Sequence, residues 1–204
     1  HVHELEVPKY ELAHYSKRTI DFEYNFPFGV SELYGLAYRT DFDLKNHMES
    51  SKQDIRYTDP QSGEKFIPHC IEPTWGVDRS VLAVLCEAYD DSNPENIILH
   101  LPAKLAPYTV AVFPLLKNKE QLVGKAKEIY NNLKKDFTVA WDDRGNVGKR
   151  YYSQDEIGTP FCVTVDFDTV EKDDCVTVRN RDTKEQPRIK ISELADYIKK
   201  QINA

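Results

Sequence analysis

The second half of this 204-residue chain alternates strand-like and helix-like segments, and this order limits its possible folds more than any other feature. Residues 107–116 ("PYTVAVFPLL") are rich in β-branched and aromatic side chains, as expected of a buried strand. Residues 119–135 carry apolar side chains at helical spacing, namely Leu122, Val123, Ala126, Ile129, Tyr130 and Leu133. A strand, a short helix ended by Gly158 and another strand follow, at 137–143, 149–158 and 160–168. This order predicts a mixed sheet covered by helices.

The pattern continues to the end of the chain with two more strands, at 174–181 and 186–191. Residues 192–202 then predict a terminal helix, because the polar Ser192 can act as its N-cap ahead of an amphipathic run. The second half is therefore expected to be an α/β domain.

The first half has a different pattern, in which strands are separated by short turns at 18–29, 31–39 and 65–73. A helix is predicted at 41–51, and residues 80–89 are apolar nearly all round, which predicts a buried helix. An antiparallel sheet with a buried helix indicates an α+β fold.

The polar stretch "YDDSNPEN" (89–96) is the predicted joint between the halves, with the domain boundary after residue 93. Residues 1–93 hold 9 Lys and Arg against 17 Asp and Glu, whereas residues 94–204 hold 18 against 17. An acidic first half suits a cationic or metal-assisted ligand. The second half can meet a polyanion through a local basic face.

Other bulk features predict a cytoplasmic protein. No apolar run approaches the length of a membrane span, so no membrane partner is expected. Four cysteines, Cys70, Cys86, Cys162 and Cys175, form no closely spaced pair, which predicts reduced thiols and no zinc site. The chain begins at His1 without a Met, and we expect it to be a fragment.

Arg79 poses an electrostatic question. It falls in the first turn of a helix that should begin near Val77, where the helix dipole disfavours a cation. Its partner can be a protein carboxylate such as Asp78 or Glu72, or the phosphate of a ligand. Gly76 allows close approach to the free N–H groups of the helix start, which favours phosphate.

Two acidic residues raise a similar question. Glu72 is expected at the end of an apolar strand before Pro73, where it needs a cation, either Arg79 or a ligand ammonium group. Glu32 lies in a predicted strand and should share a face with Tyr34 and Leu36. It can hold a nucleotide-bound metal or belong to a solvated strand face.

The second half also interleaves basic and aromatic residues, a composition that suits stacking on unpaired bases and pairing with phosphates. A solvated surface is the alternative. The residues concerned are Arg144, Lys149, Arg150, Tyr151, Tyr152, Arg179, Arg181 and Arg188.

Several stretches together resemble one enzyme family. Residues 71–89 ("IEPTWGVDRSVLAVLCEAY") resemble motif 3 of class II aminoacyl-tRNA synthetases, in the form used by homodimeric glycyl-tRNA synthetases of the archaeal/eukaryotic-like type. Further stretches resemble the same family, at 11–29, 31–48, 148–169 and 176–198. The resemblance implies that residues 1–93 are the C-terminal part of a class II catalytic domain with a mainly antiparallel sheet. It implies that residues 94–204 are an anticodon-binding domain with a mixed sheet.

The implied enzyme condenses glycine with ATP and then transfers glycine to tRNA-Gly, with ATP and Mg²⁺ as substrate and no tightly bound cofactor. The ATP and catalytic residues by resemblance are Glu32, Leu33, Gly76, Val77, Asp78 and Arg79, with Glu32 meeting Mg²⁺ through ATP. The glycine-binding residues by resemblance are Glu72, Pro73, Thr74, Trp75 and Gly76. From charge and placement, the residues expected to contact tRNA are Lys149, Arg150, Arg179 and Arg181.

The chain departs from the family pattern in two ways. Thr74 stands where many relatives have Ser, and its methyl group could crowd out a substrate with a Cβ. Motifs 1 and 2 are absent, and they build the homodimer interface and much of the ATP site, so the chain is expected to be inactive alone. An alternative is a synthetase-like accessory protein of the polymerase processivity type. The retained Glu32, Glu72 and Arg79 argue against that alternative.

Overall fold

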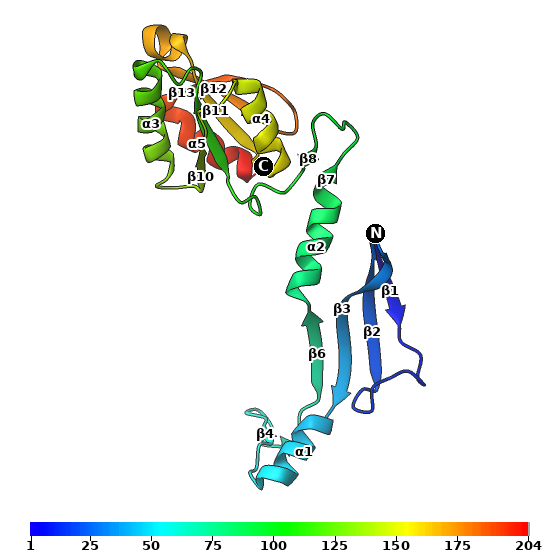
Figure 1. The fold of residues 1–204 in the computed structure, drawn as a ribbon. Coiled ribbons are helices and arrows are strands. Elements are labelled where there is room, and N and C mark those ends of the chain that lie inside the picture. The colour runs from blue at the N-terminus through cyan, green and yellow to red at the C-terminus, as the bar shows by residue number, and fades with distance from the viewer. Residues whose placement is uncertain (204) are drawn as a thin grey trace. The chain divides into compact units, whose positions relative to one another are not determined.

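The computed structural model describes residues 1–203 and divides the chain into two compact units, His1–Cys86 and the residues from Glu87 onward. Figure 1 shows the course of the chain from the blue strands of the first unit to the red helix of the second.

The first unit is built on a four-stranded antiparallel sheet with the order β1-β2-β3-β6. Its strands are β1 (Val2–Glu6), β2 (Arg18–Phe26), β3 (Gly29–Thr40) and β6 (Cys70–Trp75). Helix α1 (Phe42–Ser51) follows β3, and the short strands β4 (Tyr57–Thr58) and β5 (Lys65–Phe66) pair as a hairpin before β6. The mainly antiparallel sheet agrees with the sequence prediction.

A β-bulge in β3 decides which side chains share a face of this sheet. The register between β2 and β3 shifts at Phe22/Glu23, so Leu33 is an extra residue that reverses the alternation of side chains. Glu32 therefore lies on the same face as Gly35 and Ala37. The prediction that Glu32 shares a face with Tyr34 and Leu36 is wrong, because a bulge cannot be read from strict alternation.

Helix α2 (Val77–Ala88) begins directly after Gly76 and is less buried than its sequence predicts. Ala83 packs with Tyr24, Phe26 and Leu33 in an apolar cluster on the sheet. The outer side of the helix remains exposed at Val77, Val81, Leu82 and Leu85. The prediction of a fully buried helix is thus wrong for this chain, because the helix contacts the sheet along one side only.

The polar stretch 89–96 belongs to a small hairpin of the second unit. Strand β7 (Tyr89–Asp90) pairs with β8 (Ile98–Leu99), and the predicted boundary after residue 93 falls between these strands. The division between the units lies earlier, at Cys86/Glu87, inside α2. The polar turn residues belong to the loop of this hairpin, and no polar or Pro/Gly-rich stretch in α2 indicates the division between the units.

The second unit contains a five-stranded mixed sheet in the order β10-β9-β11-β12-β13, as predicted. The strands are β9 (Val110–Pro114), β10 (Val139–Trp141), β11 (Phe161–Val165), β12 (Cys175–Asn180) and β13 (Arg188–Lys190). Strand β9 is parallel to β10 and β11, whereas β12 and β13 are antiparallel to their neighbours.

Helices cover both faces of this mixed sheet (Figure 1). They are α3 (Glu120–Leu133), α4 (Val147–Glu156) and α5 (Leu194–Ile202). Val110 and Val112 of β9 pack in the core shared with α3 and α5, whereas Ala111 and Phe113 pack against α4. The predicted apolar face of α3 is confirmed, since four of its residues are buried in that core: Leu122, Ala126, Ile129 and Leu133.

Two short helical turns complete the second unit, a π-helical turn at Thr169–Asp173 and a 3-10 turn at Ile191–Glu193. The 3-10 turn precedes α5, and Glu193 is the N-cap residue of that helix without a side-chain capping bond. The prediction of Ser192 as N-cap is therefore wrong, because the chain already turns helically before α5 begins.

Candidate functional site

A cavity of about 420 Å³ lies over one face of the first unit's sheet, and its lining is acidic. Asp21 of β2, Glu32 of β3 and Glu72 of β6 all line it, together with Thr74. The segment between β1 and β2 contributes Val7, Glu11, Leu12, Ala13 and Tyr15. The cavity therefore offers carboxylates and a hydroxyl group, which suit a small cationic ligand.

Glu72 is the third residue of β6 and lies opposite Ala37 of β3. The prediction that it ends its strand is wrong, since β6 continues through Pro73 to Trp75. The sequence left Arg79 or a ligand ammonium group as its cation, and within the chain the cation that binds it is Arg39. Oε2 of Glu72 accepts a hydrogen bond from Nη1 of Arg39 at 2.6 Å, and Arg79 forms no ion pair with it.

Arg39 has further partners that hold it in place. Its Nε and Nη2 donate to both carboxylate oxygens of Asp43, at 2.7 and 2.8 Å. The guanidinium carbon lies 3.8 Å from the centre of the Tyr15 ring, a cation–π contact. These contacts raise the pKa of Arg39 and lower the pKa of Asp43, chiefly through the hydrogen bonds between them.

Asp21 and Glu32 approach each other above Gly35. A Cβ added at Gly35 would lie 3.4 Å from Oε1 of Glu32 and 3.7 Å from Oδ1 of Asp21. Loss of solvation raises the pKa of Asp21, and the negative charges of Glu32 and Glu23 raise it further. The cavity thus holds carboxylates that repel one another and would be relieved by a cation.

Arg79 lies in the first turn of α2, as predicted, but its partner is the backbone. Its Nη1 donates to the carbonyl oxygen of Glu32 and, at 3.5 Å, to Oγ of Ser31. Strand β6 ends at Trp75 opposite Tyr34, which leaves this stretch of β3 without a strand partner on that side. Within residues 1–203 Arg79 forms no ion pair, so the alternative of a protein carboxylate as its partner is wrong.

The other predicted residues of the first unit divide between the two sheet faces. Glu32, Glu72 and Thr74 line the acidic cavity. Pro73 and Trp75 alternate with them and point to the opposite face, where Trp75 contacts the Tyr34 ring edge-on at 6.3 Å between centroids. Leu33 is buried in the apolar cluster, whereas Val77 and Asp78 are exposed at the helix start beside Gly76.

Three of the four residues expected to contact tRNA are buried. Arg150 is 2% exposed, and its guanidinium donates to the carbonyl oxygens of Pro114, Asp143, Arg144 and Gly145. It therefore closes the loop between β10 and α4. Neither the predicted tRNA contact nor the alternative of a solvated surface describes this arrangement.

Arg179 and Arg181 of the same set also have internal partners. Arg179 is 6% exposed and forms a forked ion pair with Asp155. Arg181 is 3% exposed and donates to the carbonyl oxygens of Leu101 and Gly158. Lys149 is exposed on α4, and within residues 1–203 its ammonium group has no hydrogen-bond or ion-pair partner.

The remaining basic and aromatic candidates are mixed. Arg144 is exposed and pairs with Asp142, and Arg188 bridges Asp166 and Asp173. Tyr152 is exposed, whereas the hydroxyl of Tyr151 bonds Oγ1 of Thr164 at 2.7 Å inside the domain.

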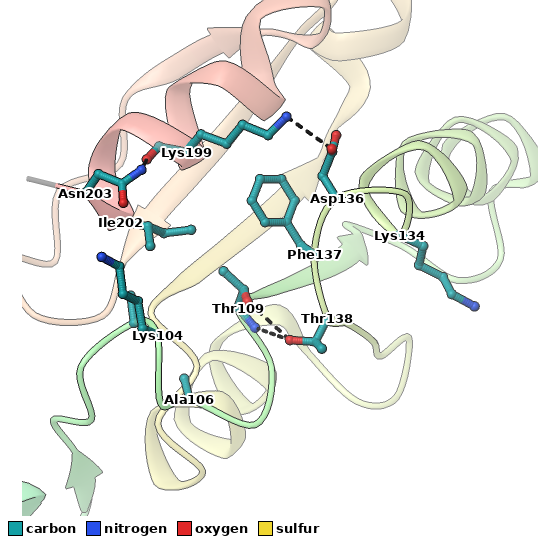
Figure 2. A pocket seen from close by; sticks show the side chains of 11 residues that line it. Lys104, Ala106, Thr109, Lys134, Asp136, Phe137, Thr138, Lys199, Ile202 and Asn203 are labelled. Atoms are coloured by element: carbon teal, nitrogen blue, oxygen red, sulfur yellow. Dashed lines mark hydrogen bonds and ion pairs between the residues drawn. The ribbon is translucent and has the colours of Figure 1, made fainter. Parts of the chain in front are cut away.

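A second cavity, of about 620 Å³, lies in the second unit where α3 and α5 end (Figure 2). Lys199 lines it and pairs with Asp136 at 3.1 Å. Lys134, at the end of α3, directs its side chain away from Lys104 and Lys199 in Figure 2. Lysines at helix C-termini balance the partial negative charge of the last carbonyls, which accounts for Lys134 and Lys199 without a ligand.

Residues 1–203 contain no cluster of three His, Cys, Asp or Glu arranged to hold a metal ion. All four cysteines are free, and burial raises the pKa of Cys162 to about 12. Within the same residues, every helix is too short or too polar to cross a bilayer.

Four residues in or beside the acidic cavity were not predicted as site residues from the sequence: Tyr15, Asp21, Arg39 and Asp43. Arg39 and Asp43 are four residues apart at the predicted start of a helix, which is the spacing of an ion pair. That signal was available. The contacts of Arg39 with Glu72 and Tyr15 join distant segments and had no local signal.

Comparison with known proteins gives two results. Residues 109–201 match the family model described as "Anticodon binding domain". The chain is 53% identical over 195 residues to a glycine–tRNA ligase of Bacillus cereus, which covers 94% of this chain. It is 50% identical over 205 residues to one of Clostridium kluyveri, and 53% over 197 residues to one of Caldanaerobacter subterraneus.

The chain spans 42% of the length of each of these relatives. It is therefore similar to glycine–tRNA ligases over nearly all of its own length, and residues 109–201 are similar to anticodon-binding domains.

Proposed function

We propose that this chain is part of a glycine–tRNA ligase, which activates glycine with ATP as glycyl-adenylate and transfers glycine to tRNA-Gly. Residues 1–93 are then the C-terminal part of a class II catalytic domain, and residues 94–204 bind the anticodon. The proposal rests on about 50% identity with glycine–tRNA ligases across nearly the whole chain. The homodimeric, archaeal/eukaryotic-like type stays a prediction, because the relatives named above are bacterial.

The acidic cavity is the proposed glycine site. Glu72 and Thr74 line it side by side on β6, where a carboxylate and a hydroxyl can receive the ammonium group of glycine. Gly35 and Ala37 form the facing part of β3, so the floor between the carboxylates lacks long side chains. The methyl group of Thr74 is proposed to disfavour a substrate with a Cβ.

The proposed ATP site lies at the start of α2. Nη1 of Arg79 is fixed by the carbonyl of Glu32, and within residues 1–203 the Nε and Nη2 donors form no hydrogen bond. These donors and the free N–H groups near Gly76 suit a phosphate. Glu32, whose side chain lines the cavity, is proposed to meet Mg²⁺ through ATP. Leu33, Val77 and Asp78 would shape the walls of this ATP site. Pro73 and Trp75, predicted for the glycine site, lie on the same strand as Glu72 and Thr74.

Catalysis in this proposal requires no protein nucleophile. The carboxylate of glycine attacks the α-phosphate of ATP and expels pyrophosphate. The contribution of the protein is to position both substrates and to neutralise phosphate charge through Arg79. Cytoplasmic localisation remains an expectation.

Glycine-dependent ATP–pyrophosphate exchange tests the proposal, with alanine and serine as control amino acids. We expect the longer protein that contains this chain to catalyse exchange with glycine, and the 204-residue chain to be inactive without motifs 1 and 2. Exchange by the 204-residue chain would overturn the need for those motifs. A longer protein that binds nucleic acid without any exchange would instead support the accessory-protein alternative.

A further inference from the structure

Arg39 occupies an unusual position in β3 beside Glu72, which lines the acidic cavity. The register between β3 and β6 shifts between Tyr38 and Thr40, so Arg39 is an extra residue in the strand. Thr40 then adopts a left-handed conformation with φ of 56°, and α1 begins two residues later. Bulges of this kind re-aim a side chain, and here the side chain of Arg39 meets Glu72.

Three side chains contact the guanidinium group of Arg39. Asp43 takes two of the N–H donors in a fork, and Glu72 takes one through Oε2. Tyr15, which comes from the segment that covers the cavity, lies against the guanidinium plane. The side chain of Arg39 is 19% exposed and that of Glu72 is 46% exposed, so Arg39 is largely covered while Glu72 stays open to solvent and to a ligand.

The charges of this cluster leave Glu72 able to bind a cation. One guanidinium cation is balanced by the carboxylate of Asp43, and the three side chains together keep one negative charge. Arg39 therefore fixes the orientation of Glu72 without cancelling the negative charge of the cluster. Glu72 accepts this bond through Oε2, and within residues 1–203 its Oε1 makes no hydrogen bond.

We propose that Arg39 is a positioning residue for the amino-acid substrate: anchored by Asp43 and Tyr15, it holds Glu72 so that Oε1 meets the ammonium group of glycine. This inference rests on the proposed function of the cavity. Arg39 does not touch the substrate itself, and it acts through Glu72.

The test is steady-state ATP–pyrophosphate exchange by the full-length protein, measured separately against glycine and against ATP. Arg39→Gln should raise KM for glycine about tenfold or more, because a charge-assisted bond to Glu72 is lost, and should change KM for ATP less than about twofold. Arg39→Lys keeps the charge but lacks the fork, so it should also raise KM for glycine. Arg56→Gln is the matched control, since Arg56 forms an exposed fork with Asp54 in the same unit.

Asp43→Asn is a second variant, which changes the anchor of Arg39 and not Arg39 itself. It leaves Glu72 untouched but removes the charge that balances Arg39, so KM for glycine should rise roughly threefold to tenfold. In a double-mutant cycle, Arg39→Gln should have less than about a twofold effect once Glu72→Gln is present.

These outcomes separate positioning from general damage. Equal rises in both KM values, or undiminished effects of Arg39→Gln in the Glu72→Gln protein, would overturn the inference. If Arg39→Gln fails to fold, the same comparison is made with Arg39→Lys and Asp43→Asn, and unchanged glycine KM in both would overturn it. A wild-type protein without glycine-dependent exchange would instead overturn the proposed function.

Discussion

Both carboxylate oxygens of Asp155 accept hydrogen bonds from the guanidinium of Arg179, each at 2.8 Å. The pair joins α4 to β12 inside the second unit, where Asp155 is 0% and Arg179 6% exposed. Lys184 adds a contact to Oδ2 of Asp155 at 3.1 Å, and the Arg179 guanidinium lies over the Tyr151 ring. Arg179 is thus a structural residue of the second unit.

Asp155→Ala should destabilise the protein by roughly 3–5 kcal/mol, because the charge of Arg179 stays buried with its main partner removed. Denaturant unfolding followed by circular dichroism measures the change. Asp168→Ala is the matched control, since Asp168 pairs with Lys172 at the surface and its loss should be worth less than about 1 kcal/mol. Similar losses for both variants would contradict the structural role of the buried pair.

Gly158→Ala should destabilise the protein more than Gly145→Ala. Both glycines have left-handed backbones, with φ of 80° and 58°, so each substitution should cost about 1–2 kcal/mol. At Gly158 the new Cβ would also lie 2.9 Å from Cδ1 of Leu101 and 3.1 Å from the carbonyl of Leu99, whereas nothing lies within 4 Å at Gly145. This crowding should add roughly 1–3 kcal/mol, measured as the difference between the two unfolding free energies.

The fold of the second unit could be predicted because local periodicity governs it. Val110 and Val112 alternate with Ala111 and Phe113, so the two pairs pack into apolar clusters on opposite faces of the sheet. The apolar residues of α3 recur at helical spacing, and these residues form its buried face. The β3 bulge at Leu33 could not be predicted in the same way. A bulge inserts one residue without a composition signal. Strict alternation along β3 therefore predicts the wrong sheet face for the side chain of Glu32.

The candidate site shows the same limit. Glu72, Thr74 and Arg79 were identified by resemblance, and the structure places them near Glu32. The partner of Glu72 was not predicted, because Arg39 lies on the neighbouring strand β3, 33 residues away in the sequence. The sequence shows that Lys149 and Arg150 are charged, but it does not show which of them is buried. The buried Arg150 and the exposed Lys149 were therefore predicted to have the same role.

Cys162 should resist alkylation in the native protein. It is buried in β11, and loss of solvation raises its pKa to about 12, so little thiolate exists near pH 8. Iodoacetamide followed by peptide mass spectrometry should label the partly exposed Cys175 much faster. In denaturant the two rates should become similar. Equal labelling in the native state would show that the strand opens readily.

Lys149→Ala should weaken binding of tRNA-Gly modestly, by about twofold to fivefold, and reduce the salt dependence by about one ion. The exposed position of Lys149 on α4 allows a phosphate contact without disturbing the fold. Lys9→Ala removes the same charge from the first unit and serves as control. A filter-binding assay at two salt concentrations decides between them. Equal effects of the two variants would indicate a nonspecific charge effect.

Asp21→Asn should stabilise the protein near neutral pH. The folded state raises the pKa of Asp21, first through loss of solvation and then through Glu32 and Glu23, so the unfolded chain releases this proton more readily. Ionisation of Asp21 therefore lowers the unfolding free energy as pH rises through the folded pKa. Below the ordinary pKa both states are protonated, and the gain from Asn should vanish.

Asp59→Asn should show the opposite sign, which makes it the control. Hydrogen bonds from the Gln61 backbone and the Ser62 hydroxyl lower the pKa of Asp59, so its charge stabilises the fold near neutral pH and not in acid. Urea unfolding near pH 7 and at a pH well below 3.8, the ordinary pKa of Asp, measures both effects. If Asp21→Asn gained nothing near pH 7, a raised pKa of Asp21 in the folded state would be ruled out. A gain would mean that the cavity keeps this carboxylate at the expense of stability.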